Sequence, residues 1–167
     1  MARTLFLKWL LFAMVIFVGA VMLYQLGGFH EIDRMDASKI SFLIIAVFSG
    51  ATAWCGILAW RFDDAAKDDN LSNIERKAEH GWFAAVICEK LGLLGTIWGF
   101  MMILVGGFST LQNADQQALT TLLERVGAGM ATAFLTTLVG LVSSILLTLQ
   151  YHALSTAIDG ARHEKTP

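Results

Sequence analysis

Four stretches without Asp, Glu, Lys or Arg are the feature that most limits how this chain can fold. They cover residues 9–29, 40–60, 91–112 and 126–151. Each reaches the roughly 20 residues that an α-helix needs to cross a hydrocarbon core of about 30 Å. Hydrophobic residues make up 56% of the chain and charged residues 16%, with a mean hydropathy of +0.60, which is more apolar than a soluble domain. We predict an all-α membrane protein with four transmembrane helices.

The first stretch also has features of a cleaved secretory signal. Arg3 and Lys8 precede it, and Val-Gly-Ala at 18–20 resembles a small-residue cleavage site. The apolar run continues past that site through Leu23 and Leu26, so it is longer than the core of a signal peptide. We therefore expect this segment to be retained as a transmembrane helix.

The polar segments between these stretches divide the chain into four parts. Gly27 and Gly28 favour a tight turn, which makes the first two spans a hairpin with a short outer loop over about 28–38. A second short outer loop is expected over about 113–125. The four parts are an outer hairpin at 1–60 (helices about 5–29 and 39–60), a charged cytoplasmic linker at 61–81, a helix pair at 82–152 (helices about 82–111 and 125–152) and a cytoplasmic tail at 153–167.

The linker over 61–81 is rich in both acidic and basic residues. Ser72 to Glu75 fits a capping box, so we expect a helix to start at Ser72 and to run into the third span with at most a brief break at Gly81. The segment is either a docking site for a cytoplasmic partner or a solvated linker. We favour the linker, because about twenty residues cannot bury a core of their own.

Lys and Arg are distributed unevenly between the two sides of the membrane. With the N-terminus inside, eight of them fall in inner segments and three, Arg34, Lys39 and Arg125, in outer loops. Cytoplasmic loops are enriched in Lys and Arg, so both termini are expected in the cytoplasm. The aromatic belt expected near the inner surface consists of Trp9, Trp60, Trp82 and Tyr151.

Small residues recur at helical spacing in the third and fourth spans. Gly92, Gly95 and Gly99 lie three and four residues apart, which places them on one face. Lipid tails do not drive helices together hydrophobically, so such a face predicts close packing against another helix. The fourth span has a stripe of small residues every four positions, with bulky residues elsewhere: Ala128, Thr132, Thr136, Gly140, Ser144 and Thr148.

Thr96 and Thr137 differ from the other hydroxyl residues because each lies near the middle of its span, beside the small face. A hydroxyl in a membrane helix ordinarily bonds back to the carbonyl one turn earlier, and that reading stays open for both. The alternative is that the two hydroxyls face a shared wet path. Glu89 precedes the third stretch by two residues and is expected to reach the interface or pair with Lys or Arg, so the spans have no obvious proton carrier.

Two motifs connect these helices to a known family. They are GLLGTIWGF at 92–100 and MATAFLTTLVGLVSSI at 130–145. They resemble the two signature helices of the MotA/TolQ/ExbB proton-channel family. The first is similar to Gly-Leu-Leu-Gly-Thr-Val-Trp-Gly almost residue for residue, and the second to Ala-Leu-x-x-Thr-Ala-x-Gly-Leu, with Thr137, Gly140 and Leu141 in register. The resemblance covers roughly residues 88–152.

The resemblance implies a specific assembly. Family members are similar in forming a homopentameric ring, whose signature helices line a central pore that holds a dimer of a single-span protein similar to ExbD, TolR or MotB. The partner carries a membrane aspartate that takes and releases the proton, and ring threonines at the positions of Thr96 and Thr137 help form its path. The residues expected to line the pore or pack the helices are Gly92, Gly95, Gly99, Thr132, Thr136, Gly140 and Ser144.

The implied function is that of the ring, or stator-type, subunit of a motor driven by proton motive force. Its implied location is the bacterial inner membrane, its ion H⁺, and its partners further copies of itself, the single-span subunit and membrane lipids. No other cofactor is implied.

The chain also departs from the family pattern. TolQ-like and ExbB-like chains usually carry a glutamate where this chain has Thr132, and the prolines expected near Glu89 and Leu146 are missing. Four spans resemble MotA more than the three-span TolQ and ExbB. MotA-like stators, however, have a large cytoplasmic domain where this chain has only about twenty residues, which argues against a flagellar role.

Other classes of function are weaker alternatives. A self-sufficient oligomeric channel would share the glycine faces but would conduct without a partner, and a membrane scaffold would leave the two threonines without a task. No Ser-His-Asp arrangement, phosphate loop or metal cluster appears, so we do not expect an enzyme. The net charge of −2 and the lack of a basic cluster do not favour nucleic acid, and Cys55 and Cys88 are expected to be small buried residues without disulfide or metal.

Overall fold

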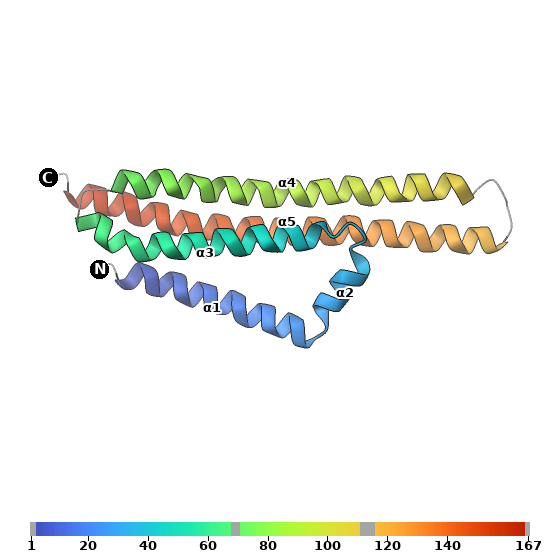
Figure 1. The fold of residues 1–167 in the computed structure, drawn as a ribbon, viewed down its shortest axis with the longest axis horizontal. Helices are drawn as coiled ribbons and strands as arrows, with labels where there is room; N and C mark the ends of the chain where they lie inside the picture. Colours follow the sequence, from blue (N-terminus) through green and yellow to red (C-terminus); the bar gives the residue numbers. More distant parts are fainter. Residues whose placement is uncertain (1–2, 68–70, 111–115, 166–167) are drawn as a thin grey trace.

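The computed structural model describes residues 3–67, 71–110 and 116–165, and every element within them is helical. The predicted all-α fold is therefore confirmed for the described part of the chain. In chain order the helices are α1 (Arg3–Gln25), α2 (Gly28–Met35), α3 (Ile40–Lys67), α4 (Leu71–Thr110) and α5 (Gln116–Lys165) (Figure 1).

The three long helices α3, α4 and α5 lie side by side, and α4 and α5 form a hairpin that extends beyond α3 at one end (Figure 1). Helix α1 lies against the C-terminal half of α3 and diverges from it towards α2. The first and last described residues, Arg3 and Lys165, lie at the same end of the molecule, because α1, α3, α4 and α5 run in alternating directions.

Three helices are long and apolar enough to cross a membrane. These segments are Ile40–Phe62, Arg76–Val105 and Leu119–Ala161, and they correspond to the second, third and fourth predicted spans. In α1 the apolar segment Trp9–Met22 is shorter. The whole helix has 23 residues, or about 35 Å at 1.5 Å per residue, so the first span stays a prediction that the length of α1 permits.

The short outer loop predicted over 28–38 is wrong in part, because most of it forms helix α2. Gly27 adopts a left-handed conformation with φ +74°, which supports the expected tight turn after α1. Helix α2 is amphipathic: Ile32 is buried, while Asp33 and Arg34 are exposed. The alternation of apolar and charged residues was compatible with this helix, but its eight residues are too few for a clear periodic pattern.

Helix α4 begins one residue before the predicted start at Ser72 and ends at Thr110, close to the predicted 111, whereas α5 is longer than predicted. Helix α4 continues without a break through Gly81, and α5 begins at Gln116 and includes most of the predicted tail. No glycine or proline lies between Gln116 and Arg125. This part of the expected second outer loop therefore contains no residue that would stop helix α5. The side chains of the proposed capping box, Ser72 to Glu75, lie outside the described residues except for Ile74.

Tyr151 joins the three long helices and is not part of an interfacial belt. Its side chain is fully buried, its ring occupies the space beside Gly81 of α4, and its hydroxyl donates to the carbonyl oxygen of Ala51 in α3 at 2.8 Å. The prediction that Tyr151 faces the membrane surface is therefore wrong. Gly81 does not interrupt α4. Its role there is to leave space for the ring of Tyr151, which any Cβ at this position would overlap.

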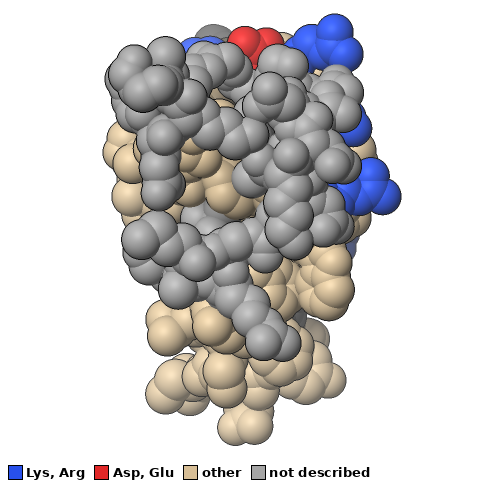
Figure 2. Space-filling model, turned by 90° about the vertical axis from the view of Figure 1, so that its left-hand side faces the viewer, with Lys and Arg blue, Asp and Glu red and all other residues tan. Residues whose placement is uncertain are grey.

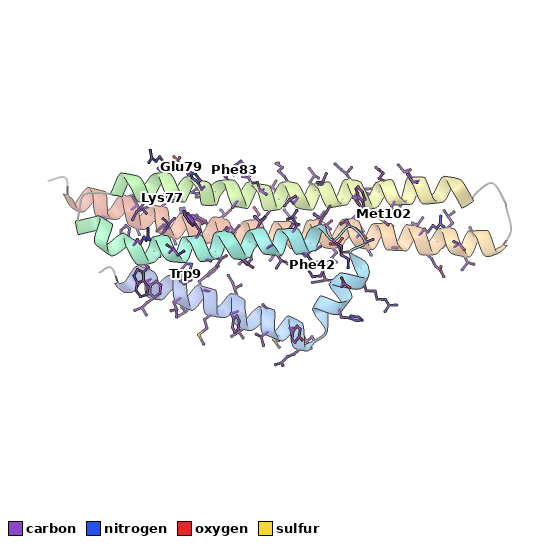
Figure 3. The ribbon with its side chains drawn as sticks, in the orientation of Figure 1. Trp9, Phe42, Lys77, Glu79, Phe83 and Met102 are labelled. Atoms are coloured by element: carbon purple, nitrogen blue, oxygen red, sulfur yellow. The ribbon has the colours of Figure 1, made fainter. Side chains whose placement is uncertain are left out.

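The buried core surrounds Tyr151 and is formed by α3, α4 and α5. Cys55 and Cys88 belong to it as small buried side chains, as the sequence predicted. Figure 3 shows that the N-terminal part of α4 carries Lys77 and Glu79, with Phe83 one turn further on. The other large buried side chains of this core are Ile44, Leu58, Phe62, Ile74, Leu147, Leu154 and Ile158.

We expect Gly81→Ala to destabilise the bundle by about 1–3 kcal/mol, because a methyl group at this position overlaps the ring of Tyr151. Thermal unfolding of the purified protein in detergent measures the effect. The matched control is Gly160→Ala, also within a helix, where an added Cβ meets no atom within 4 Å and alanine gains helix propensity. Equal unfolding temperatures for the two variants would contradict the role assigned to Gly81.

Candidate functional site at the α4–α5 seam

Helices α4 and α5 approach each other closely along a seam of small residues, which we call the α4–α5 seam: Gly92, Gly95 and Gly99 of α4 facing Gly129, Ala133, Thr136 and Gly140 of α5. A Cβ added to Gly92 would lie 3.0 Å from the carbonyl oxygen of Thr136 and 3.2 Å from the Cα of Gly140. One added to Gly140 would lie 2.8 Å from the carbonyl oxygen of Cys88. Backbone meets backbone here, so only glycine fits at either position.

The seam continues towards the end of the hairpin where α4 ends and α5 begins. A Cβ at Gly95 would overlap the side chain of Thr136, and one at Gly99 would lie 2.9 Å from the Cβ of Ala133. Gly129 faces the carbonyl oxygen of Gly99, although sequence reasoning did not select it. Its position four residues before Ala133 is a small-xxx-small spacing that would have identified it.

The four-residue stripe predicted in α5 does not stay on one face. Thr132, Thr136 and Gly140 are buried, whereas Ser144 and Thr148 are half-buried and Ala128 is exposed. Four residues turn an α-helix by about 400°, so each step of the stripe rotates by about 40° away from the contact. The buried line shortens its steps instead and passes through Ser143, Leu147, Tyr151 and Leu154.

Thr96 and Thr137 meet at one edge of the seam, where their hydroxyl oxygens are hydrogen-bonded to each other. The Thr137 hydroxyl also lies 2.9 Å from the carbonyl oxygen of Ala133, and that of Thr96 lies 3.2 Å from the carbonyl oxygen of Gly92. The bond back to the carbonyl one turn earlier is therefore confirmed for both residues, and the two hydroxyls also contact each other, whereas the shared wet path stays a prediction. Both side chains are half-buried.

The threonine pair has more acceptors than protons. Each hydroxyl has one proton and two lone pairs, so the two protons of the pair are shared among the two hydroxyl oxygens and the carbonyl oxygens of Gly92 and Ala133. When one hydroxyl donates to the other, the second donates to a carbonyl, and the roles exchange by rotation about the C–O bonds. Such a pair is able to accept a hydrogen bond from a protonated group or to donate one to a carboxylate.

An apolar exposed surface surrounds the pair. On α4 the residues one turn away from Thr96 are Leu93 and Phe100, each 55% exposed. On α5 the residues one turn away from Thr137 are Phe134 and Leu141, which are 68% and 46% exposed. The hydroxyl pair is thus a polar point on an uncharged surface that the described residues of the chain leave exposed.

Thr132 does not contact this pair but binds the backbone of the connection between α2 and α3. Its hydroxyl donates to the carbonyl oxygen of Met35 at 2.8 Å, where α2 ends, and accepts from the backbone N–H of Ala37 at 3.4 Å. It fixes the connection between α2 and α3 against α5. Thr136 is also buried, and its hydroxyl bonds back to the carbonyl oxygen of Thr132 at 2.9 Å.

Asp36, in the same connection, is a functional-looking residue that the sequence reasoning missed. Its fully buried carboxylate accepts from the N–H of Ser38 at 3.0 Å, the hydroxyl of Ser38 at 2.6 Å and the N–H of Ser41 at 2.7 Å. Burial raises the pKa of Asp36, but the hydrogen bonds from Ser38 and Ser41 outweigh this effect and hold the pKa below its usual value of 3.8. The carboxylate thus caps the first turn of α3. The run Asp-Ala-Ser just before the span is a capping signal.

Glu89 lies on the surface of α4 and forms an ion pair with Lys90, at 3.6 Å. Pairing with a basic residue is what the sequence predicted. The side chains are 49% and 65% exposed, so Glu89 does not belong to the α4–α5 seam. Among the residues that the structure describes, no three His, Cys, Asp or Glu side chains are placed to hold a metal ion.

We expect Gly95→Leu to separate α4 from α5 and to destabilise the protein by at least about 1–3 kcal/mol, because the new side chain overlaps Thr136. Gly127→Leu is the control on the same hairpin, since a Cβ at Gly127 meets no atom within 4 Å. Thermal unfolding and size-exclusion chromatography in detergent measure stability and assembly. A Gly95→Leu protein as stable as the control would show that close approach at the seam is not required.

Asp36→Asn should destabilise the protein at pH 7 by about 1–3 kcal/mol, because it removes a charged acceptor from three hydrogen bonds. The native pKa is depressed, so the contribution of the carboxylate is fully present well above pH 3.8 and is lost as the pH falls through the native pKa. The difference in unfolding temperature between wild type and variant should therefore shrink below pH 3.8.

Asp33→Asn is the control for this pH series. Asp33 is 53% exposed and pairs with Lys39 at the surface, so its loss should change stability by less than about 1 kcal/mol. A difference between wild type and Asp36→Asn that stays constant down to acid pH would contradict the capping role.

Comparison with known proteins gives one match. Residues 64–166 match the MotA/TolQ/ExbB proton channel family. The matched range includes all of α4 and α5, whereas α1, α2 and most of α3 lie outside it. No curated protein and no solved structure matches the chain significantly. The match covers well over half of the chain and contains both sides of the α4–α5 seam. The chain belongs to the MotA/TolQ/ExbB proton channel family.

Proposed function

We propose that this chain is the ring subunit of an inner-membrane motor that is driven by proton motive force and moves a single-span partner. Membership of a proton channel family supports a role in proton conduction, and the helices match a membrane protein. The motor, the partner and the ring of five are our proposal. The observation that carries it is the pair formed by Thr96 and Thr137.

The threonine pair has the properties of a proton path but not of a proton store. Neutral hydroxyls exchange hydrogen bonds, but they do not hold an added proton near pH 7, a task that requires a carboxylate or an imidazole. The sequence has no Asp, Glu or His between Leu91 and Phe108 or between Val126 and Tyr151. The titrating group must therefore come from another chain, which is what a partner aspartate would supply.

The exposed surface around the pair supports an assembly around the partner. Leu93, Phe100, Phe134 and Leu141 form an apolar surface large enough to need a cover of lipid or protein. When this surface faces a pore, a transmembrane helix of the partner covers it and brings an aspartate to the hydroxyls. Other copies of the chain then cover the remaining faces of α4 and α5.

The charge distribution supports the proposed orientation. Figure 2 looks along the bundle from the end where α1 begins and α5 ends, and the visible Lys and Arg side chains lie at the upper and right-hand edges of this view. The described basic residues near this end include Arg61, Arg76 and Lys77, all exposed. By the positive-inside rule this end lies in the cytoplasm, with both termini.

The short connection between α3 and α4 supports a role outside the flagellum. Helix α3 ends at Lys67 and α4 begins at Leu71, so the chain turns back at once. There is no room here for a separate domain that would meet a rotor. The work performed is therefore assigned to the partner, which the proton flow moves relative to the ring.

The test uses the two hydroxyls. We expect Thr137→Ala and Thr96→Val to leave assembly intact and to reduce partner-dependent proton flux at least tenfold, because each removes one member of the pair, and a single group in proton transfer contributes roughly 10²–10⁴-fold. Flux is measured with a pH-sensitive dye in proteoliposomes that contain the ring and its co-purified partner. Thr137→Ser keeps the hydroxyl and should conserve the flux.

Ser49→Ala is the matched control for loss of a hydroxyl that bonds back along its own helix. Ser49 is exposed on α3, and its hydroxyl lies 2.8 Å from the carbonyl oxygen of Ile45. Wild-type flux in both threonine variants would refute the proposed path. Full flux from the ring without a partner would favour the alternative, a self-sufficient channel.

A further inference from the structure

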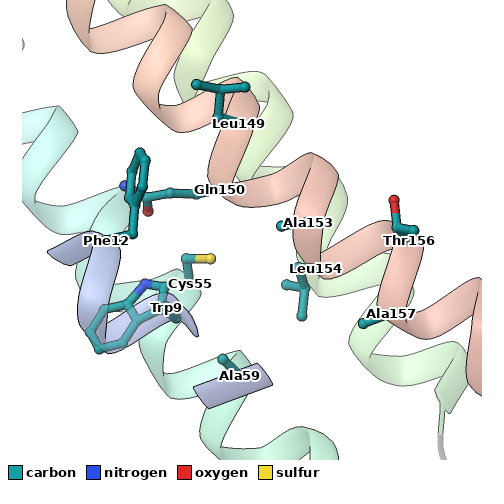
Figure 4. Close-up of a pocket in the computed structure, with 10 residues that line it drawn as sticks. All are labelled: Trp9, Phe12, Cys55, Ala59, Leu149, Gln150, Ala153, Leu154, Thr156 and Ala157. Carbon is teal, nitrogen blue, oxygen red and sulfur yellow. The ribbon is translucent and has the colours of Figure 1, made fainter. Parts of the chain in front are cut away.

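A pocket of about 480 Å³ lies between α1, α3 and α5, away from the α4–α5 seam (Figure 4). Its volume is in the range of sites that bind small molecules. Most of its wall is apolar, with Phe12 from α1, Ala59 from α3, and Leu149 and Ala153 from α5. The function proposed above makes no use of this pocket.

Two buried polar atoms in the wall of the pocket have no hydrogen-bond partner among the described residues. They are Nε1 of Trp9 and Oε1 of Gln150, whose side chain is only 6% exposed. Buried polar groups in folded proteins are nearly always hydrogen-bonded, so two in one pocket point to a ligand that supplies the missing bonds. The indole N–H only donates, and the ligand must therefore offer an acceptor to Trp9.

Gln150 is able to offer a donor in the same way. Its Nε2 lies 3.4 Å from the hydroxyl oxygen of Thr52, and a threonine hydroxyl both donates and accepts. A half-turn of the amide therefore places its oxygen at Thr52 and directs the NH₂ group into the pocket. Trp9 and Gln150 then present two N–H donors to one ligand.

The position of Trp9 is fixed by a glycine. Any Cβ at Gly56 of α3 would overlap the indole ring, so the ring lies directly on the backbone of α3. Phe6, three residues earlier on α1, stacks against the indole ring, with its ring centroid 5.8 Å from that of Trp9. This packing holds the N–H donor in place before a ligand binds.

The level of the pocket along the helices indicates the chemical class of the ligand. Ala59, in the pocket wall, lies three residues before Phe62, where the apolar segment of α3 ends. The exposed side chains of Trp60 and Arg61 follow directly on α3. The pocket thus runs from the membrane interior to the interfacial region, where the ester groups of phospholipids lie above their acyl chains.

We propose that this pocket binds a diacyl phospholipid, with its ester carbonyl oxygens accepting from Trp9 and Gln150 and one acyl chain against Phe12, Leu149 and Ala153. Carbonyls are acceptors only, which matches two donors. The bound lipid fills the space between α1 and α5 and ties the first helix to the bundle. The site is independent of the proton path.

The test is a competition between two lipids that differ only in their carbonyl groups. The purified complex is reconstituted with a trace of phosphatidylglycerol that carries a diazirine in its acyl chain, and photo-crosslinks are mapped by mass spectrometry. Unlabelled dioleoyl phosphatidylglycerol and its di-ether analogue then compete for the site. We expect crosslinks on α1 and α5 at the pocket, and about tenfold weaker competition by the ether lipid, as the loss of two hydrogen bonds implies.

Two substitutions and a control assign the effect to the named atoms. Trp9→Phe combined with Gln150→Met keeps the apolar shape but removes both donors, so the ester and ether lipids should compete equally. Trp54→Phe, on the same helix as Gly56 but outside the pocket wall, should keep the preference for the ester. Ala153→Leu should block crosslinking by filling the pocket.

The comparison of the two lipids on the wild-type protein decides the proposal even when a variant fails to assemble. Equal competition by both lipids in wild type would overturn it. A wild-type protein without lipid crosslinks at the pocket would overturn it as well.

Discussion

The close approach of α4 and α5 is the contact on which the rest of the structure depends. Gly92 and Gly140 bring two helix backbones together in a setting where lipid provides no hydrophobic drive for association. Dispersion contacts between backbones replace that drive, and they fall off steeply with distance, so each glycine contributes through the side chain it lacks. The seam holds Thr96 beside Thr137, and α5 in turn positions α2 through Thr132 and α3 through Tyr151.

The chemistry of the seam suggests why a second protein is needed. The helices provide hydroxyls where a proton passes, but none of their membrane residues at this level holds one. Separating path from carrier makes conduction depend on the partner, so a ring without its partner leaks few protons. The division also couples proton transfer to movement of the partner, because its carboxylate must meet the hydroxyls of one subunit and then those of the next. This account rests on the proposed function.

Much of the fold and part of the site could be predicted from the sequence. Long charge-free stretches and glycine spacing identified α3, α4, α5 and the face of α4 that meets α5.

The errors have physical causes. The four-residue stripe of α5 drifts around a 3.6-residue helix, so Ser144 and Thr148 leave the contact. Tyrosine is a residue type that is common at membrane interfaces, which led to the prediction for Tyr151. Its ring is buried because Gly81, seventy residues earlier in the chain, leaves space for it. Asp36 was passed over because it lies in a loop-like segment, and its burial depends on α5.

The central claim is that this chain forms a ring around a partner that carries the titrating group. Native mass spectrometry of the complex, purified gently from its own membrane, tests it most directly. We expect five copies of this chain together with two copies of a small single-span protein that has an aspartate in its membrane helix. A ring that is purified without any companion, and that conducts protons by itself at full rate, would contradict the account.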